Sequence, residues 1–231
     1  MPIYNREEQY LKLLAHKEHT VKELSEKLFI SEPTVRRDIA LLRKKELIVC
    51  NRGIVKLKSK YADQRIPFFI RDLEYTDAKR KITQEASKLI KNGYVIMLDA
   101  STTAYHLLPY ISSHENILVI TNGAKTALES AMLGIKTICT GGDMTLDSFS
   151  YVGSDAEKML KSYNADIAFF SCRGVSDDGI ITDNSILENS LRQIMIKNSK
   201  KSYLLCDKSK FGHKLLNTLC HKDEIDGIIT N

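Results

Sequence analysis

The sequence lacks the features of several classes of protein. None of its five cysteines forms a Cys-x-x-Cys pair and their number is odd, so neither a zinc ribbon nor a disulfide framework is indicated. Its histidines show no metal-ligand spacing, and we expect no metal and no cofactor. There is no apolar run as long as a membrane-spanning helix and no signal peptide, so we expect a cytoplasmic protein that does not enter a membrane.

The positive charge of the chain is concentrated near its beginning. The 231 residues carry a formal net charge of +5. Residues 1–60 hold 14 Lys and Arg against 8 Asp and Glu, whereas the rest of the chain holds 20 against 21. The whole basic excess therefore lies in the first quarter, as expected if that part is a small nucleic-acid-binding module.

Residues 31–43 have the pattern of a helix. Ser31 is a good N-cap, because its hydroxyl can accept a hydrogen bond from an amide of the first turn. Val35, Ile39 and Leu42 recur at helical spacing, which predicts one buried apolar face.

Three polar side chains lie off that face, near the start of the predicted helix: Thr34, Arg36 and Arg37. Recognition helices contact base edges from this end. An arginine can donate two hydrogen bonds to a guanine edge or to a phosphate. The alternative for this stretch alone is a solvated helix face with two surface arginines.

The neighbouring segments favour DNA binding. Thr20 and Glu23 have the spacing of a capping box, which predicts a short helix just before the turn into the Ser31 helix. Two β-rich runs flank residues 51–53, which predicts a hairpin with Arg52 at its tip. We therefore expect a winged helix-turn-helix domain over residues 1–57. The alternatives are a helical protein-interaction module or an RNA-binding module.

A joint between domains is expected over residues 58–76. Its first part, to residue 65, is polar and aperiodic. Residues 66–71 are apolar and interrupted by Pro67, and we expect them to pack on one or both domains.

Residues 77–231 alternate between apolar runs and helical patterns, which predicts an α/β domain with a mainly parallel sheet and helices on both faces. Strands are expected at 94–98, 117–121, 137–140, 167–170, 203–206 and 227–230, and helices near 78–90, 104–111, 123–133, 154–163 and 185–198.

Small, hydroxylated or charged residues follow five of these strands, where ligands bind in such folds. The candidates are Asp99, Ser101, Thr102, Thr103, Thr121, Asn122, Gly141, Gly142, Arg173, Gly174, Asp207, Lys208 and Lys210. The loop over residues 99–103 joins a strand to a helix and is a ready anion site. Each loop taken singly is also an ordinary turn or helix cap.

The segment Ser31-x-x-Thr34-Val-Arg36-Arg37-Asp38-Ile resembles the recognition-helix signature of the DeoR family of bacterial transcriptional regulators. The resemblance extends to Thr121-Asn122, Gly141-Gly142 and the motif Asp207-Lys-Ser-Lys-Phe-Gly. The wing departs from the family pattern, because the usual basic-His-Gly-Gly run is replaced by residues 51–53.

The resemblance implies an effector-sensing domain with the fold of ribose phosphate and glucosamine phosphate isomerases. Its ligand would be a small phosphorylated sugar. Ser101, Thr102 and Thr103 would hold the phosphate with Lys210 near it, and the other strand-end residues would line the rest of the site.

An isomerase needs a carboxylate base, and the sequence offers no obvious one. Residues 171–174 hold none after the fourth strand, and the next carboxylate in the chain is Asp177. Glu188 could face the site or the solvent, and Cys172 has no histidine nearby that would activate it as a nucleophile. We therefore expect no catalytic residue and no enzyme; the alternative is a sugar phosphate isomerase fused to a DNA-binding domain.

Together these features predict a repressor of a carbohydrate-metabolism operon. It would bind double-stranded operator DNA as a homo-oligomer, a dimer or a tetramer, because paired half-sites require matched subunits. A phosphorylated sugar would close the strand-end loops and move the 58–76 joint.

Overall fold

The computed structural model describes residues 3–58 and 68–231. The chain forms two compact units, which divide between Glu74 and Tyr75. Most of the expected joint, residues 59–67, lies outside the described residues. The next residues form helix α4 (Phe68–Leu73), which the sequence pattern does not predict. Its Ile70 is buried in the core of the first unit.

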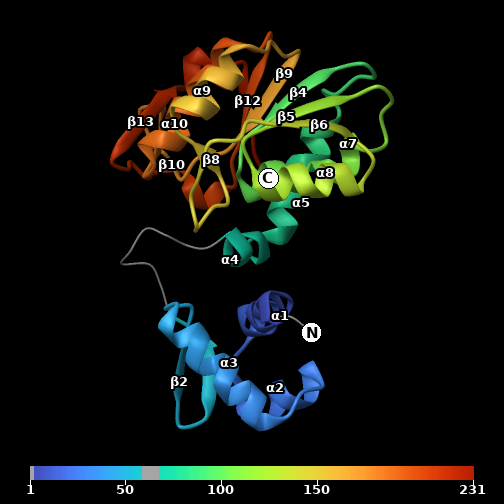
Figure 1. Ribbon diagram of the computed structural model, residues 1–231. Coiled ribbons are helices and arrows are strands. Elements are labelled where there is room, and N and C mark those ends of the chain that lie inside the picture. Colours follow the sequence, from blue (N-terminus) through green and yellow to red (C-terminus); the bar gives the residue numbers. More distant parts are fainter. Residues whose placement is uncertain (1–2, 59–67) are drawn as a thin grey trace. The chain divides into compact units, whose positions relative to one another are not determined.

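Over residues 3–57 the first unit is a head of three helices with a small antiparallel sheet (Figure 1), and α4 completes the unit. Its elements before α4 are α1 (Ile3–His16), β1 (His19–Thr20), α2 (Val21–Leu28), α3 (Glu32–Lys44), β2 (Ile48–Asn51) and β3 (Ile54–Leu57). β2 and β3 pair antiparallel as the predicted hairpin, and β1 adds a third strand beside β3. The helix-turn-helix with a wing is thus confirmed.

Apolar side chains of all three helices and of the hairpin meet in one core. Tyr10, Leu24, Val35 and Val55 are fully buried there. The predicted capping box starts α2, since the Thr20 hydroxyl accepts a 3.1 Å hydrogen bond from the Glu23 amide and the Glu23 carboxylate accepts one from the Thr20 amide. The capping box fixes where α2 begins, and the shared core packs α2 against α3.

The second unit contains a six-stranded parallel sheet. In spatial order its strands are β14 (Gly227–Ile229), β12 (Ser202–Leu205), β9 (Ile167–Phe170), β4 (Val95–Leu98), β5 (Leu118–Thr121) and β6 (Lys136–Cys139). These are the six predicted strands, so the prediction of a mainly parallel sheet is confirmed. All six carboxyl ends lie at one edge of the sheet.

Helices cover both faces of this sheet. Alternate strand residues face opposite ways, so Ile96 and Leu98 join one apolar cluster and Met97 joins another. The first cluster receives α5 (Thr76–Ser87), α6 (Thr102–Tyr105) and α7 (Leu108–Ile111). The second receives α9 (Ser154–Lys161) and α10 (Ile186–Lys197), whereas α8 (Ala124–Met132) packs near β5 and β6.

Two features of this unit differ from the sequence prediction. The helix expected over residues 104–111 is wrong: the chain forms α6 and α7 as separate single turns. Pro109 has no amide hydrogen, and its ring would clash with the Tyr105 carbonyl in a continuous helix.

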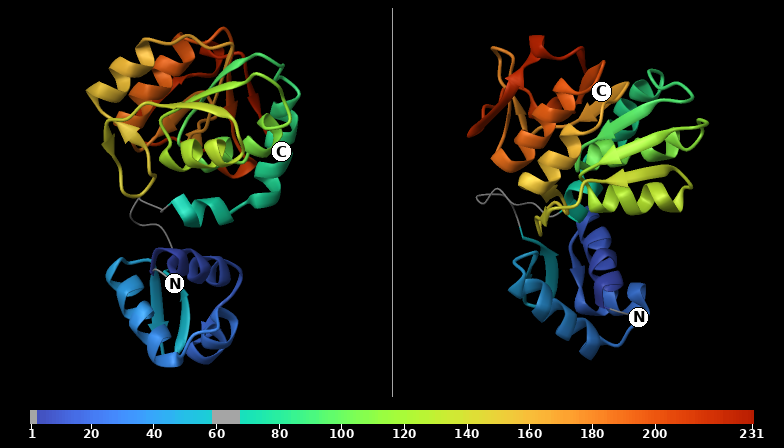
Figure 2. Two further views of the ribbon diagram at one scale, coloured as in Figure 1. Left: turned by 45° about the vertical axis from the view of Figure 1, so that its right-hand side comes forward. Right: turned by 45° about the horizontal axis from the view of Figure 1, so that its top comes forward.

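The second difference is a set of short antiparallel strands. They are the hairpin β7 (Asp143–Met144) and β8 (Tyr151–Val152), and the sheet β10 (Gly174–Val175), β11 (Ile180–Asp183) and β13 (Asn217–His221). Figure 2 shows β11 and β13, orange to red, on the side of the main sheet away from β6. Of these short strands, β7, β8 and β10 have two residues each, which is too short to show alternation in a sequence.

In the part of the chain that the structure describes, no helix is both long and apolar enough to cross a membrane.

Candidate functional site

The start of α3 presents polar side chains to solvent. Arg36 and Arg37 are exposed and Thr34 is half-buried, while Val35 is fully buried. The prediction that the Ser31 hydroxyl caps α3 is wrong. Ser31 has the backbone geometry of an N-cap, but its Oγ lies 3.0 Å from the Thr34 Oγ1 instead. The Ser31 hydroxyl thus pairs with the Thr34 hydroxyl and not with a backbone amide of the first turn. The two hydroxyls form an exposed polar pair at the start of the helix.

The two arginines differ in their surroundings. Arg36 Nη2 lies 2.9 Å from the Glu32 Oε2 one turn earlier, and its side chain is 67% exposed. An ion pair this exposed contributes little to stability, so Arg36 can exchange Glu32 for a phosphate at small cost. Arg37 is exposed on the same turn. Both side chains are therefore accessible to a nucleic acid.

Asp38, in the middle of the same motif, has an internal role that sequence reasoning missed. It is buried, and its Oδ2 accepts a 2.9 Å hydrogen bond from Arg6 Nε of α1. Tyr10 donates its hydroxyl to the same oxygen at 3.4 Å. Burial, and then the nearby Asp38 carboxylate, raise the pKa of Tyr10. Asp38 thus fixes α3 against α1, which determines where Arg36 and Arg37 project.

The tip of the wing is a tight turn through two residues with positive φ, Arg52 at 50° and Gly53 at 78°. Such a turn matches the twist of the hairpin, and glycine and asparagine adopt it most easily. An arginine at the first position is conformationally disfavoured. The Arg52 side chain is exposed and cationic, so the turn itself gives no reason for an arginine at this position.

Replacing Arg52 with asparagine is expected to leave the hairpin intact and to weaken DNA binding by the same factor for every DNA sequence. Asparagine tolerates the turn but makes no charge contact with a phosphate. The slope of log affinity against log salt concentration should become shallower by about one unit, which corresponds to one lost phosphate contact. Arg52→Lys, which keeps the charge, serves as the control. A salt slope equal to that of the wild type would show that Arg52 makes no contact with the DNA backbone.

At the end of β4, the loop predicted to bind an anion is held by Asp99. The Asp99 Oδ1 accepts hydrogen bonds from the amide and the hydroxyl of Ser101, at 3.1 and 2.5 Å. The Ser101 Oγ in turn accepts a 3.1 Å bond from the Ala104 amide and caps α6. Ser101 therefore shapes the loop, and Thr102 and Thr103 follow it in the first turn of α6, both buried.

The residues after β5 and β6 fasten the β7–β8 hairpin. Asn122 Nδ2 donates to the Ser150 Oγ at 2.8 Å and to the Tyr151 carbonyl at 3.2 Å. Gly142 has a φ of 104°, and a Cβ there would lie 2.7 Å from the Val152 carbonyl oxygen, so only glycine fits. Thr121 accepts the Gly123 amide, and Gly141 also has positive φ. Asn122 and Gly142 therefore lie against the hairpin, whereas Thr121 and Gly141 shape the turns in which they stand.

The ends of β9 and β12 meet through Lys210. Its Nζ donates to the Ser171 Oγ at 2.9 Å and lies 3.6 Å from the Asp207 Oδ2. The Ser171 amide reaches Asp99 at 3.2 Å, which links this pair to the β4 loop. Lys208 is exposed. The structure thus brings Lys210 and Asp207 to the β4 and β9 loops, and leaves the Lys208 side chain at the surface.

The Lys210–Asp207 pair predicts a pH dependence. Burial raises the pKa of Asp207, but Lys210 and the hydrogen bonds from Ser209 outweigh it, so the pKa falls below its usual 3.8. A carboxyl with a depressed folded-state pKa adds stability above the unfolded pKa and loses it as pH falls through the folded one. The free-energy difference between the wild type and Lys210→Met, from urea unfolding, should therefore shrink as pH falls below 3.8. A difference that does not change with pH would contradict the pairing.

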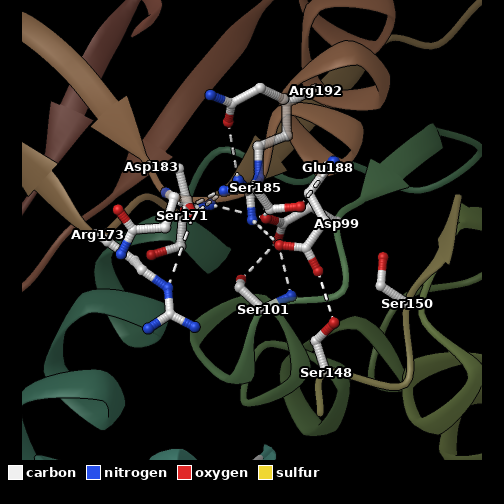
Figure 3. A network of polar contacts seen from close by, with 12 residues as sticks. Asp99, Ser101, Ser148, Ser150, Ser171, Arg173, Asp183, Ser185, Glu188 and Arg192 are labelled. Carbon is white, nitrogen blue, oxygen red and sulfur yellow. Dashed lines mark hydrogen bonds and ion pairs between the residues drawn. The ribbon is translucent and has the colours of Figure 1, made fainter. Parts of the chain in front are cut away.

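A buried arginine that sequence reasoning missed lies at the centre of the strand ends (Figure 3). Arg192 of α10 donates from Nε to the Asp99 Oδ2 at 2.9 Å and from Nη1 to the Asp183 Oδ2 at 3.0 Å. Its Nη2 lies 3.5 Å from the Glu188 Oε2. Glu188 faces this network and not the solvent, and its Oε1 accepts a 2.6 Å bond from Ser148 of the β7–β8 connection.

Residues 171–174 themselves hold no carboxylate, but the fold brings one from elsewhere in the chain to the end of β9. Asp183 comes from β11 and pairs at 3.6 Å with Arg173, which follows β9. Gly174 is required beside it, since a Cβ would lie 2.6 Å from the His213 carbonyl oxygen. The one local signal in the sequence is the four-residue spacing of Glu188 and Arg192 on one helix.

Comparison with known proteins agrees with this architecture. Residues 6–57 match an HTH domain, and residues 74–231 match the DeoR C terminal sensor domain. The L-fucose operon activator of Escherichia coli is 34% identical over 95% of this chain and 90% of its own length. The lactose phosphotransferase system repressor of Staphylococcus epidermidis is 29% identical over 99% of this chain and 92% of its own.

Two solved structures align with this chain across slightly more than half of their own length. The eIF2B delta chain of Chaetomium thermophilum gives a TM-score of 0.53 at 18% identity, covering 70% of this chain and 58% of that one. The ribose 5-phosphate isomerase of Methanocaldococcus jannaschii gives 0.46 at 20% identity, covering 59% and 54%. At these identities the likeness concerns the fold alone. With a helix-turn-helix head and a sensor domain that spans more than half of its length, the chain belongs to the DeoR family of DNA-binding transcriptional regulators.

Proposed function

We propose that the protein represses a carbohydrate-metabolism operon and that a phosphorylated sugar relieves the repression. The observation that carries this proposal is the pairing of two parts in one chain. A winged head exposes Arg36 and Arg37 at the start of α3, and a family sensor domain gathers polar residues at the carboxyl ends of its strands.

The head supports binding to double-stranded DNA. Its basic excess lies within residues 1–60, and its recognition helix starts with hydroxyl and guanidinium groups that face the solvent. Such groups can bind base edges in the major groove. Arg52 at the wing tip would contact the phosphate backbone. Operator binding takes place in the cytoplasm, where the protein is proposed to act.

The sensor domain supports binding of a small anion with hydroxyl groups. The predicted phosphate loop, residues 99–103, is ordered by Asp99, and Lys210 supplies a cation to the same edge of the sheet. A phosphate would accept hydrogen bonds from the loop and pair with Lys210. The hydroxyls of the sugar would meet the carboxylates and amides beside it.

We also propose that the protein binds its effector without turning it over. The carboxylates at the strand ends are already paired, Asp99, Asp183 and Glu188 with Arg192 and Asp207 with Lys210. Cys172 is buried in an apolar cluster with Phe170 and Leu204. The alternative is an isomerase fused to a DNA-binding head. NMR of candidate sugar phosphates incubated with the protein separates the two, because only an enzyme converts one isomer into the other.

Operator binding is proposed to require a homo-oligomer. Two heads on matched subunits would read two half-sites, and the effector would change their spacing. Light scattering of the protein with and without DNA measures the number of subunits. A monomer on a single half-site would contradict this part of the proposal.

A thermal-shift screen tests the effector class. Sugar phosphates and their unphosphorylated counterparts are compared at equal concentration. A ligand at about 100 times its dissociation constant adds about 2.7 kcal/mol to stability and raises the melting temperature. A rise with phosphorylated compounds alone supports the proposal, and a flat response across the panel contradicts it. The sign of regulation follows from transcription in a deletion strain, which should rise for a repressor and fall for an activator.

A further inference from the structure

Arg192 is more buried and more fully engaged than its place on a helix requires. Its side chain is 7% exposed, and its guanidinium contacts three carboxylates and, at 3.1 Å, the Asn189 Oδ1. The nearby carboxylates raise its pKa in spite of burial. The planar fork of an arginine can reach all these acceptors at once, which a lysine cannot.

Stability alone is a poor explanation for such a cluster. Removing a cation and several carboxylates from water is costly, and apolar side chains of similar volume often give equal or greater stability. What an ion cluster supplies better than an apolar core is a defined geometry for the elements that carry its members. Perturbed ionisable groups accordingly gather at functional sites.

Each carboxylate of the cluster also contacts a different part of the strand-end region, by hydrogen bonds or an ion pair (Figure 3). Asp99 holds the amides of Ser101 and Ser171, in the loops after β4 and β9. Asp183 holds the Arg173 side chain. Glu188 holds Ser148 and with it the connection between β7 and β8.

We propose that Arg192 is a positioning residue for the effector site, an inference that rests on the function proposed above. It contacts no effector itself. It fixes the 99–103 loop through Asp99, Arg173 through Asp183, and the 145–150 connection through Glu188. One side chain thereby sets three separate segments of the strand-end region in register with one another.

Hydrogen exchange of the whole protein without effector tests the positioning directly. Arg192→Lys keeps the positive charge but loses the fork. We expect amide exchange in residues 99–103 and 145–150 to accelerate at least tenfold, with β4 and β9 protected as in the wild type. Glu188→Ala should accelerate exchange in 145–150 only. The control is Lys197→Met, an exposed residue on the same helix. Unchanged loops, or an equal rise throughout the domain, would overturn the proposal.

Effector affinity provides the second readout. Calorimetry is done with sugar phosphates at a temperature where circular dichroism shows Arg192→Lys to be folded. Loss of a residue that orients ligand-binding groups typically lowers the affinity about tenfold or more. We expect at least that loss, with operator binding in the absence of effector unchanged. Loosened loops with full effector affinity would overturn the proposal. If the wild type binds no sugar phosphate, the proposed function fails, and the exchange experiment still decides whether Arg192 positions the loops.

Discussion

Replacing Arg37 with alanine is expected to weaken binding to operator DNA by about 1–3 kcal/mol if the side chain reads a base. Arg37 is exposed at the start of α3, next to Arg36, whose guanidinium is already paired with Glu32. Asp38 beside it is anchored to Arg6, so the helix keeps its position when Arg37 is truncated. The loss should therefore reflect the missing contact and not a displaced helix.

The measurement is fluorescence anisotropy with a duplex selected for tight binding from a random library. The control is Lys197→Ala, which also removes one positive charge, at an exposed position of the sensor domain. A base contact predicts that Arg37→Ala also relaxes the sequence preference at one position. An equal loss on every duplex, with a shallower salt slope, would assign Arg37 to the phosphate backbone instead. Wild-type affinity would exclude Arg37 from the interface.

Replacing Lys210 with methionine is expected to remove most of the effector response and leave operator binding intact. Lys210 is the cation that joins the ends of β9 and β12, through Ser171 and Asp207. Hydrogen bonds to charged groups contribute about 1.5–3 kcal/mol each, which corresponds to a loss of at least tenfold in effector affinity. Methionine keeps the length of the side chain, so packing changes little.

The matched control for Lys210 is Lys201→Met. Lys201 is exposed and directly precedes β12, so it lies at the amino end of the same strand, opposite the candidate site. Calorimetry with sugar phosphates should give wild-type affinity for this variant. Equal affinities for the two variants would place the phosphate elsewhere than at the end of β12.

Features with a local pattern could be predicted from the sequence. The capping box at Thr20, the buried face of α3 and the six parallel strands each follow from short-range spacing, and the structure has them. The Ser31 cap could not be decided in this way, because the same hydroxyl has two possible partners. The break between α6 and α7 was predictable in principle from Pro109.

The centre of the candidate site could not be predicted. Arg192 and Asp99 are 93 residues apart in the sequence, and Ser148 and Glu188 are 40 apart. Nothing in the spacing of these residues indicates that they meet. Only the parallel topology, which places β4 and β9 side by side, and the antiparallel β11 beyond them bring the carboxylates around one guanidinium.

The most direct test of the regulatory mechanism is the effect of sugar phosphates on operator affinity, measured by anisotropy with the full chain and its selected duplex. The mechanism predicts that one phosphorylated sugar weakens operator binding by at least about fivefold, the lower end of typical coupling between sites, while its unphosphorylated counterpart has no effect. Operator affinity that is unchanged by every compound, or changed equally by both members of a pair, would contradict the assignment of the strand-end loops as a phosphate sensor.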